Sequence, residues 1–413
     1  MPTPPILEIY VVWHPDDVNG EAVADQLTKH FHGPAYSGLA GGAVEVYRRS
    51  LGWHEPDGAP RPIPFMHELP GGLAPAQLTV VVPLLGRGLA RAVREEGEWR
   101  DYVESMFAAD PPLPRGPSSA PWVAVHPLQC RGDLSGTQLE RLAARPQAIP
   151  SIALDDPASL AREVAQAIIQ RLHRESGEPG DDRVKVFVSH TKRHAPPELD
   201  GGVGLVESVR QMLQQTHLDA FFDAHDIQSG EDWVDRLTSE AGRNALLMVR
   251  TDLYASREWT QREVLVAKWK DVPIVALHAV RAQEDRGSFL MDHVPVVACP
   301  LGEPGPAIGA ALNRLVDEAL KKALWGAQRV YLQQQGFDWL PANAPEPITL
   351  ARWLIEHRQD SGDPRIVIIH PDPPLGPPEF DVIEQLCRLA GVTGEVDVLT
   401  PRTFAARGGG VST

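Results

Sequence analysis

A short apolar run that ends in a histidine recurs three times, and this repeat constrains the fold more than any other feature of the chain. The copies read EIYVVWHPD at residues 8–16, KVFVSH at 185–190 and RIVIIHPD at 365–372. Each copy precedes polar residues and then a segment with apolar residues at helical spacing. Runs rich in β-branched residues predict strands, and the spacing that follows predicts helices. The sequence therefore predicts three copies of a strand–loop–helix unit.

The first two copies continue in the same order. In the first copy, further strand-like runs follow at residues 43–47, 78–84, 122–128 and 150–154. In the second copy, they follow at residues 220–223, 245–249, 274–280 and 294–298. Each copy then closes with an amphipathic segment, at residues 157–174 and 307–325. Strands that alternate with helices predict an α/β fold of flavodoxin-like parallel sheets with helices on both faces.

The third copy is shorter than the other two. After its first strand and helix it has one further strand-like run, at residues 395–399. Polar stretches rich in Pro and Gly separate the copies at residues 175–182 and 336–347. We therefore expect two full units and a partial third, at residues 1–175, 183–326 and 347–413.

The composition limits the classes of partner. The 413 residues carry 39 Lys and Arg against 55 Asp and Glu, a net charge of −16. No overall positive field would draw such a chain to phosphate backbones, which disfavours nucleic acid as a partner. The chain has no apolar stretch of about 18 residues and no signal-peptide pattern at its start, so we expect no membrane partner and a cytoplasmic location. Its three widely spaced cysteines fit reduced thiols.

Three loops with candidate catalytic or binding side chains follow strands of the middle unit. They are SHTKRH at 189–194, FFDAHDIQSGEDW at 221–233 and YASREWTQREVLVAKWK at 254–270. In an open parallel sheet, ligands bind outside the carboxyl ends of the strands. The sequence therefore predicts that these loops converge on one site.

The third loop contains a tryptophan and a glutamate four residues apart. If Ser256 caps a helix there, Trp259 and Glu263 lie on one face of its first turns. An indole offers a stacking surface for a planar base, and a carboxylate can stabilise an oxocarbenium-like centre as an N-glycosidic bond breaks. The ordinary alternative is a helix that packs Trp259 into the core and leaves Glu263 in water.

The strings VFVSHT, FFDAHDIQSGEDW and SREWTQRE resemble, in this order, the three boxes of bacterial Toll/interleukin-1 receptor (TIR) domains. The resemblance covers about residues 183–326. Many TIR domains are NAD+ glycohydrolases or cyclases, which cleave the nicotinamide–ribose bond with a glutamate in an SxxWxxxE pattern. The resemblance implies that Glu263 is the catalytic residue and that Trp259 and Ser256 bind substrate.

Further roles follow from the same resemblance. Asp223 corresponds to the family's substrate-side aspartate, and Ser189 and His190 would line the opposite wall. Residues 226–230, beginning with Asp226, would form a loop that gates the site or contacts other domains. Thr260 departs from the family, which often has cysteine there, but keeps a small residue.

The resemblance also implies partners and a role. NAD+ would be a substrate, with no resident cofactor and no metal, and the product would be ADP-ribose or a cyclic isomer. TIR sites are typically completed between molecules, which implies self-association or contact with other TIR domains. Such proteins commonly serve bacterial anti-phage defence through NAD+ depletion or a signal nucleotide.

The first unit resembles the same fold without the catalytic pattern. Its matching helix has Trp99 but Val103 at the position of the glutamate, and Glu104 would face elsewhere. We therefore expect a TIR-like unit without catalysis. Arg48, Arg49 and the loop at residues 60–64 are candidate contact surfaces.

Two other functions remain open. In the first, all units are non-catalytic TIR–TIR assembly modules and Glu263 is incidental. In the second, the chain is a nucleoside deoxyribosyltransferase-like enzyme, which also uses a glutamate at an N-glycosidic bond. A histidine-based metal site and a Ser/His/Asp hydrolase are disfavoured because HExxH and GxSxG are absent.

Overall fold

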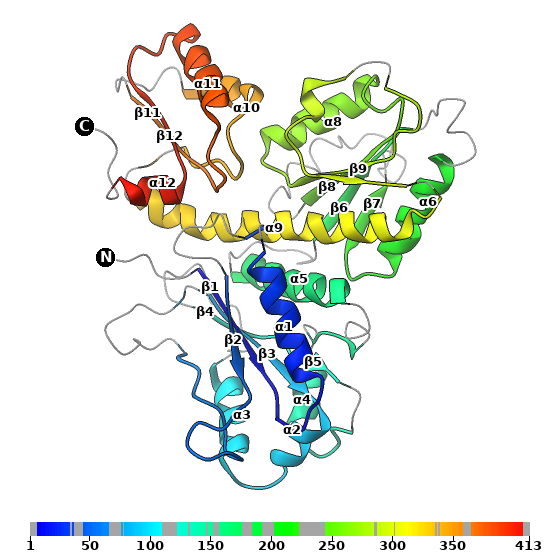
Figure 1. Ribbon diagram of the computed structural model, residues 1–413, viewed down its shortest axis with the longest axis vertical. Helices are drawn as coiled ribbons and strands as arrows, with labels where there is room; N and C mark the ends of the chain where they lie inside the picture. Colours follow the sequence, from blue (N-terminus) through cyan, green and yellow to red (C-terminus); the bar gives the residue numbers. More distant parts are fainter. Residues whose placement is uncertain are drawn as a thin grey trace. The chain divides into compact units, whose positions relative to one another are not determined.

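The computed structural model describes most of the chain in two compact units, residues 1–182 and 183–413. Each unit is described by itself below (Figure 1). The residues that the structure describes are 6–33, 35–36, 44–65, 76, 78–109, 122–130, 133–145, 148–151, 157–175, 184–191, 202–222, 244–284, 287–300, 302–334, 337, 339–357 and 365–407.

The first unit is built on a parallel sheet. Its strands are β1 (Leu7–Val12), β2 (Glu45–Arg49), β3 (Leu78–Leu85), β4 (Trp122–Val125) and β5 (Leu128–Gln129). They lie in the order β2-β1-β3-β4, and β5 also pairs with β3. Every strand pair is parallel, as the right-handed crossovers of alternating strands and helices require. The first unit therefore has the predicted flavodoxin-like order.

Helices cover both faces of this sheet. They are α1 (Gly20–Phe31), α2 (Arg87–Ala92), α3 (Glu98–Ala109), α4 (Leu139–Ala143) and α5 (Pro157–Glu175). One core cluster joins side chains of α2, α3 and α4 to β1 and β3, while α1 and α5 contact each other. All residues of β1 and β3 are buried, because neither face of these central strands meets water.

The second unit repeats this plan. Its sheet contains β6 (Lys185–Ser189), β7 (Asp219–Phe222), β8 (Asn244–Arg250), β9 (Ile274–His278) and β10 (Val296–Ala298). The order is β10-β9-β8-β6-β7, and every pair is parallel. The two sheets therefore share the arrangement in which the second strand lies outside the first and the remaining strands follow on the other side.

The helices of the second unit are α6 (Gly202–Gln214), α8 (Glu258–Trp269) and α9 (Gly305–Gln334), together with the short 3-10 helix η3 (Phe289–Met291). A core cluster packs α8 and η3 against β8 and β9. The long helix α9 contacts α6, β8 and β9 (Figure 1). Trp325 of α9 is fully buried, and its indole Nε1 donates to the carbonyl of Leu340 at 3.2 Å.

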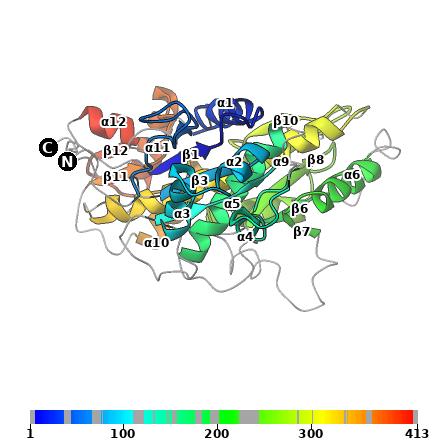
Figure 2. The same ribbon diagram turned by 90° about the horizontal axis from the view of Figure 1, so that it is seen from below.

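The last part of the second unit contains α10 (Pro347–His357), β11 (Ile366–Ile369), α11 (Pro377–Leu389), β12 (Val396–Leu399) and α12 (Pro401–Ala406). The two parallel strands lie side by side in Figure 1 and Figure 2. A small core holds Leu350, Ile368, Ile383 and Cys387. On the side of β11 away from β12, Trp339 forms a single parallel bridge with Ile368.

The predicted strands and helices are confirmed with the following differences. The fourth run of the first unit divides into β4 and β5. Its fifth run forms no described strand, the preceding Ile149 makes a single bridge with Leu128, and residues 152–156 lie outside the described part. The helix predicted to end at Trp325 continues through Gly326 to Gln334, because residues with good helix propensity follow the glycine. The helices α2, α4, α10 and α12 lie outside the predicted elements. Among the described residues, no helix combines the length and apolarity needed to cross a bilayer.

Candidate functional site

Helix α8 carries the predicted tryptophan and glutamate, but Ser256 does not cap it. The N-cap residue is Arg257, in extended conformation and without a side-chain cap. The Ser256 hydroxyl instead donates back to the carbonyl of Leu253 at 3.0 Å. Thr260 ties the helix start to the preceding turn, because its hydroxyl lies 2.6 Å from the carbonyl of Tyr254. The turn at residues 252–256 uses the Ser256 hydroxyl for a hydrogen bond of its own, so this hydroxyl does not cap α8.

Glu263 and Trp259 have exposures opposite to those of an ordinary surface helix. The glutamate is 3% exposed and lies on the buried face of α8, whereas the indole is 40% exposed. The alternative in which Trp259 fills the core and Glu263 points into water is therefore wrong. Burying a carboxylate costs free energy unless hydrogen bonds compensate, so its neighbours decide what it can do.

Two hydroxyl groups form a chain that ends on Glu263. The Ser189 Oγ, at the carboxyl end of β6, donates to the Glu263 Oε2. It also lies 2.5 Å from the Tyr254 hydroxyl. A serine hydroxyl has one hydrogen, so Ser189 must accept from Tyr254 when it donates to the carboxylate. The order Tyr254 to Ser189 to Glu263 fixes the orientation of the carboxyl group.

Tyr254 remains a neutral phenol in this chain. It is completely buried, and burial together with the negative charge of Glu263 raises the pKa of its hydroxyl well above the usual value. The hydrogen bond with Ser189 and the charge of Arg250 act in the opposite direction but do not prevail. Tyr254 is therefore a permanent donor toward Ser189 at neutral pH.

Charged contacts hold the loops at this end of the sheet. Arg250, the last residue of β8, makes two hydrogen bonds of 2.7 Å with the carboxylate of Glu284. The carboxylate of Asp252 accepts from the backbone N–H groups of Arg281 and Ala282 at 2.7 and 3.1 Å. These contacts join the segment after β8 to the segment after β9. They give the turn that carries Tyr254 a fixed position.

The structure brings together some of the predicted site residues. Ser189 contacts Glu263 directly, while Trp259 and Ser256 lie at the start of the same helix. His190 is half-buried, and its Nδ1 lies 3.4 Å from the carbonyl of Val188. Asp223 and Asp226 fall in residues 223–243, outside the described part of the chain.

Tyr254 was not among the predicted site residues. A tyrosine five residues before a tryptophan gives no sign in the sequence that its hydroxyl will face a serine 65 positions earlier. The signal that could have found it is the position of residues 254–256 immediately after a buried strand, where side chains turn toward the end of the sheet.

The corresponding helix of the first unit has an apolar buried face. Trp99 is 5% exposed and Val103 is fully buried. Glu104 points to solvent and pairs with Arg100 at 3.2 Å. The predicted absence of a carboxylate at this buried position is confirmed.

The candidate contact arginines of the first unit are engaged within it. Arg48 pairs with Glu21 and Asp25 of α1. The guanidinium of Arg49 lies 4.9 Å from the ring centre of Tyr10. Their side chains therefore brace α1 and the sheet.

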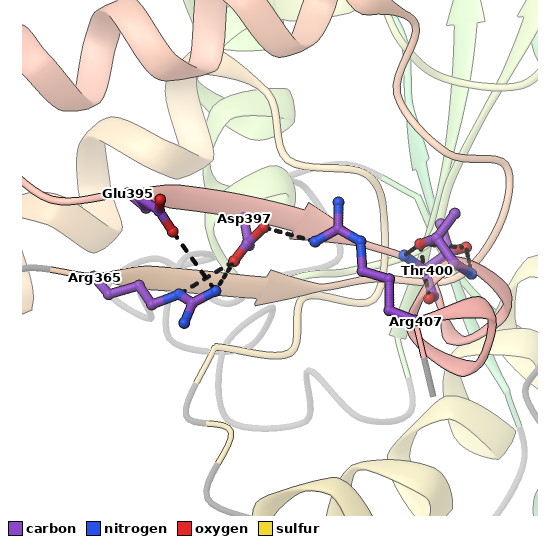
Figure 3. A network of polar contacts seen from close by, with 6 residues as sticks. Arg365, Glu395, Asp397, Thr400 and Arg407 are labelled. Carbon is purple, nitrogen blue, oxygen red and sulfur yellow. Dashed lines mark hydrogen bonds and ion pairs between the residues drawn. The ribbon is translucent and has the colours of Figure 1, made fainter. Parts of the chain in front are cut away.

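The C-terminal strands hold a partly buried carboxylate whose charge is balanced by arginines (Figure 3). Asp397 of β12 accepts from Arg365 at 2.6 Å and from Arg407 at 2.8 Å. Burial opposes ionisation of Asp397, but the hydrogen bonds from Arg365 and Arg407 outweigh it and lower the pKa of the carboxyl group. This network fastens α12 to the sheet and is structural.

No cluster of three or more His, Cys, Asp or Glu side chains is placed to hold a metal ion within the described ranges. No protein-family model matches the chain, and no curated protein matches it either.

Proposed function

We propose that the second unit cleaves the nicotinamide–ribose bond of NAD+, as a glycohydrolase or cyclase, with Glu263 as the catalytic carboxylate. The proposal depends above all on one observation. A glutamate is buried and held by a serine at the carboxyl end of a parallel sheet, beside a half-exposed indole. A surface helix without such a function would place these two side chains the other way round.

Cleavage of the nicotinamide–ribose bond requires little acid catalysis from the protein. When the bond between the ribose C1′ and the nicotinamide nitrogen breaks, the electron pair moves to a ring nitrogen that already carries a positive charge. Nicotinamide therefore leaves as a neutral molecule without a proton. A positive, oxocarbenium-like centre remains on the ribose, and a fixed carboxylate nearby stabilises it.

Each residue of the proposed site would have a role in this reaction. Glu263 would face the developing positive charge, and Tyr254 and Ser189 would keep its carboxyl group in one orientation. The exposed indole of Trp259 would stack on a planar ring of the substrate. Addition of water to C1′ with loss of a proton gives ADP-ribose, and attack by an adenine nitrogen of the same molecule gives a cyclic isomer.

The test is nicotinamide release from NAD+ by the purified full chain, comparing wild type with Glu263→Ala. Glu258→Ala is the matched control, because Glu258 lies on the same helix but its side chain is 92% exposed. We expect release by wild type and Glu258→Ala, and loss of release in Glu263→Ala. Release by Glu263→Ala at the wild-type rate would exclude Glu263 as the catalytic residue.

Failure of wild type to release nicotinamide at high protein concentration would instead favour the assembly module. Base exchange on deoxynucleosides would favour the deoxyribosyltransferase. If NAD+ is the substrate, the defence role predicts that cellular NAD+ falls when the protein is activated. Unchanged NAD+ and no new nucleotide product would contradict that role.

A further inference from the structure

The first unit has a cavity of its own, separate from the site on α8. Its volume is about 550 Å³. The lining side chains come from the loop after β1, from the first turns of α1, from the end of β3 and from the residues after β5. The order β2-β1-β3-β4 reverses direction between β1 and β3. The cavity therefore lies at the topological switch point, where open α/β sheets bind ligands.

Hydrogen bonds fix the cavity wall between the ends of β1 and β3. The two carboxylate oxygens of Asp17 accept from the backbone N–H groups of Gly88 and Leu89 at 2.8 and 3.0 Å. A Cβ atom at Gly86 would lie 2.3 Å from the Asp17 carboxylate, so only glycine permits this approach. These contacts fix the loop after β1 against the start of α2.

Among the described residues that line the cavity, Arg87 is the cation without a carboxylate partner. Asp16 pairs with Arg91, and Asp17 is satisfied by the two backbone donors. Arg87 lines the cavity and is exposed, and no hydrogen bond or ion pair joins it to another described residue. An exposed guanidinium at a cavity suits a phosphate group, which it can bind through two parallel hydrogen bonds.

The rest of the lining suits the remainder of a nucleotide. Val18, which is 89% exposed, provides apolar surface, while Asn19 and Gln26 provide amide groups. Burial raises the pKa of Cys130 to about 12, so its thiol stays neutral and adds to the apolar surface. The volume exceeds what a phosphate ion alone would fill and falls in the ordinary range of small-molecule sites, about 300–1,000 Å³.

We infer that the first unit binds a nucleoside phosphate in this cavity, with the phosphate on Arg87 and the base or sugar against Val18 and the amides of Asn19 and Gln26. This site is distinct from the proposed catalytic site, which lies in the other unit. The first unit then acts as a binding module, in keeping with the apolar residue at Val103.

Calorimetry on the full chain carrying Glu263→Gln tests this site without consuming the ligand. AMP and ADP-ribose are the probes, and adenosine is the control that lacks phosphate. We expect Arg87→Gln to weaken binding of AMP or ADP-ribose about tenfold or more, since it removes a charge-assisted contact. Binding of adenosine should not change. Arg94→Gln, at an exposed arginine of the same unit outside the cavity lining, should leave all binding unchanged.

A second variant, Ala22→Phe, places a larger side chain into the cavity from an exposed position on α1 and should abolish binding. Circular dichroism checks that this variant folds. The inference is overturned if neither AMP nor ADP-ribose binds at millimolar concentration, or if binding survives both Arg87→Gln and Ala22→Phe. Neither result depends on whether the second unit cleaves NAD+, because nicotinamide release is measured separately.

Discussion

Helices α3 and α8 begin with the same two residues, Glu and Trp, and follow the third strand of their sheets, yet they use the tryptophan in opposite ways. In the first unit Trp99 is buried beside Val103, whereas in the second Trp259 is half-exposed and the buried position belongs to Glu263. The difference is not confined to the helix. The residue before the first histidine is Trp13 in one unit and Ser189 in the other.

This contrast teaches that a buried carboxylate requires a matching set of neighbours. Glu263 has the Ser189 hydroxyl, which in turn has the Tyr254 hydroxyl. The corresponding places in the first unit hold Trp13 and Arg94, and neither is a hydroxyl donor. The two units therefore differ at three matched positions. Exchanging one residue alone between the units should not reproduce the arrangement of the other unit.

Glu263→Val, which copies the residue of the first unit, should have the largest effect. We expect nicotinamide release to fall about a thousandfold or more, because the carboxylate that stabilises the positive centre is removed. Stability should change by less than about 2 kcal/mol, since removal of a buried charge offsets the lost hydrogen bond with Ser189. Urea unfolding and the NAD+ assay on one preparation measure both. A large loss of stability would mean that Glu263 is a structural residue.

Val103→Glu is the reverse exchange. It places a carboxylate in a fully buried site whose neighbours include Trp99 and Met106. We expect a loss of roughly 3–5 kcal/mol in the unfolding free energy of the first unit, because the charge loses its hydration among mostly apolar side chains. Val103→Ile is the control and should cost less than about 1.5 kcal/mol. If Val103→Glu has the same unfolding free energy as wild type, the first unit offers this carboxylate a polar partner, which would contradict the apolar nature of the site.

The C-terminal end of α8 holds a buried ion pair. The Lys268 Nζ near the end of α8 is buried, donates to the carbonyl of Asp292 at 2.8 Å and pairs with Glu346 at 3.0 Å. Lys268→Met should destabilise the second unit by about 3 kcal/mol, because it leaves Glu346 without its cation. The double variant Lys268→Met with Glu346→Gln should recover more than half of this loss. Additive losses in the cycle would contradict a direct coupling.

Tyr254→Phe tests the hydroxyl chain without touching the carboxylate. We expect a fall of about tenfold in kcat with little change in KM, because Glu263 loses orientation and not contact with substrate. The raised pKa of Tyr254 keeps the phenol protonated, so the wild-type rate should show no loss due to this group up to about pH 10. An unchanged rate in Tyr254→Phe would remove Tyr254 from the site.

Asp397→Asn should have the smallest effect. Its carboxylate is held by arginines where Glu263 is held by a hydroxyl. The lowered pKa of Asp397 contributes stability that is present above the unfolded value of about 4 and is lost as the pH falls through the folded value. Asp397→Asn should cost about 1 kcal/mol at pH 7 and should reduce the acid sensitivity of unfolding below pH 4. Equal acid sensitivity in both proteins would contradict this account.

The repeat predicted the sheets well, because strand order in α/β units follows from alternation and handedness. Val103 and Glu104 also followed from the sequence, since their positions on a helix are set by its 100° step. The role of Tyr254 could not be predicted, because it depends on how a turn after β8 meets the end of β6. For the same reason Ser256 was misassigned as a cap, since a hydroxyl chooses between equivalent carbonyl and N–H partners only in three dimensions.

The bridge between Trp339 and Ile368 has a consequence for how this protein can associate. It places a backbone segment beside β11, and the N–H of Ile369 donates to the Trp339 carbonyl at 3.2 Å. Among the described strands, β12 pairs only with β11, and no described strand occupies its outer side. A sheet that can grow from one side joins two molecules and then stops. Contact through β12 would therefore give closed pairs and not filaments.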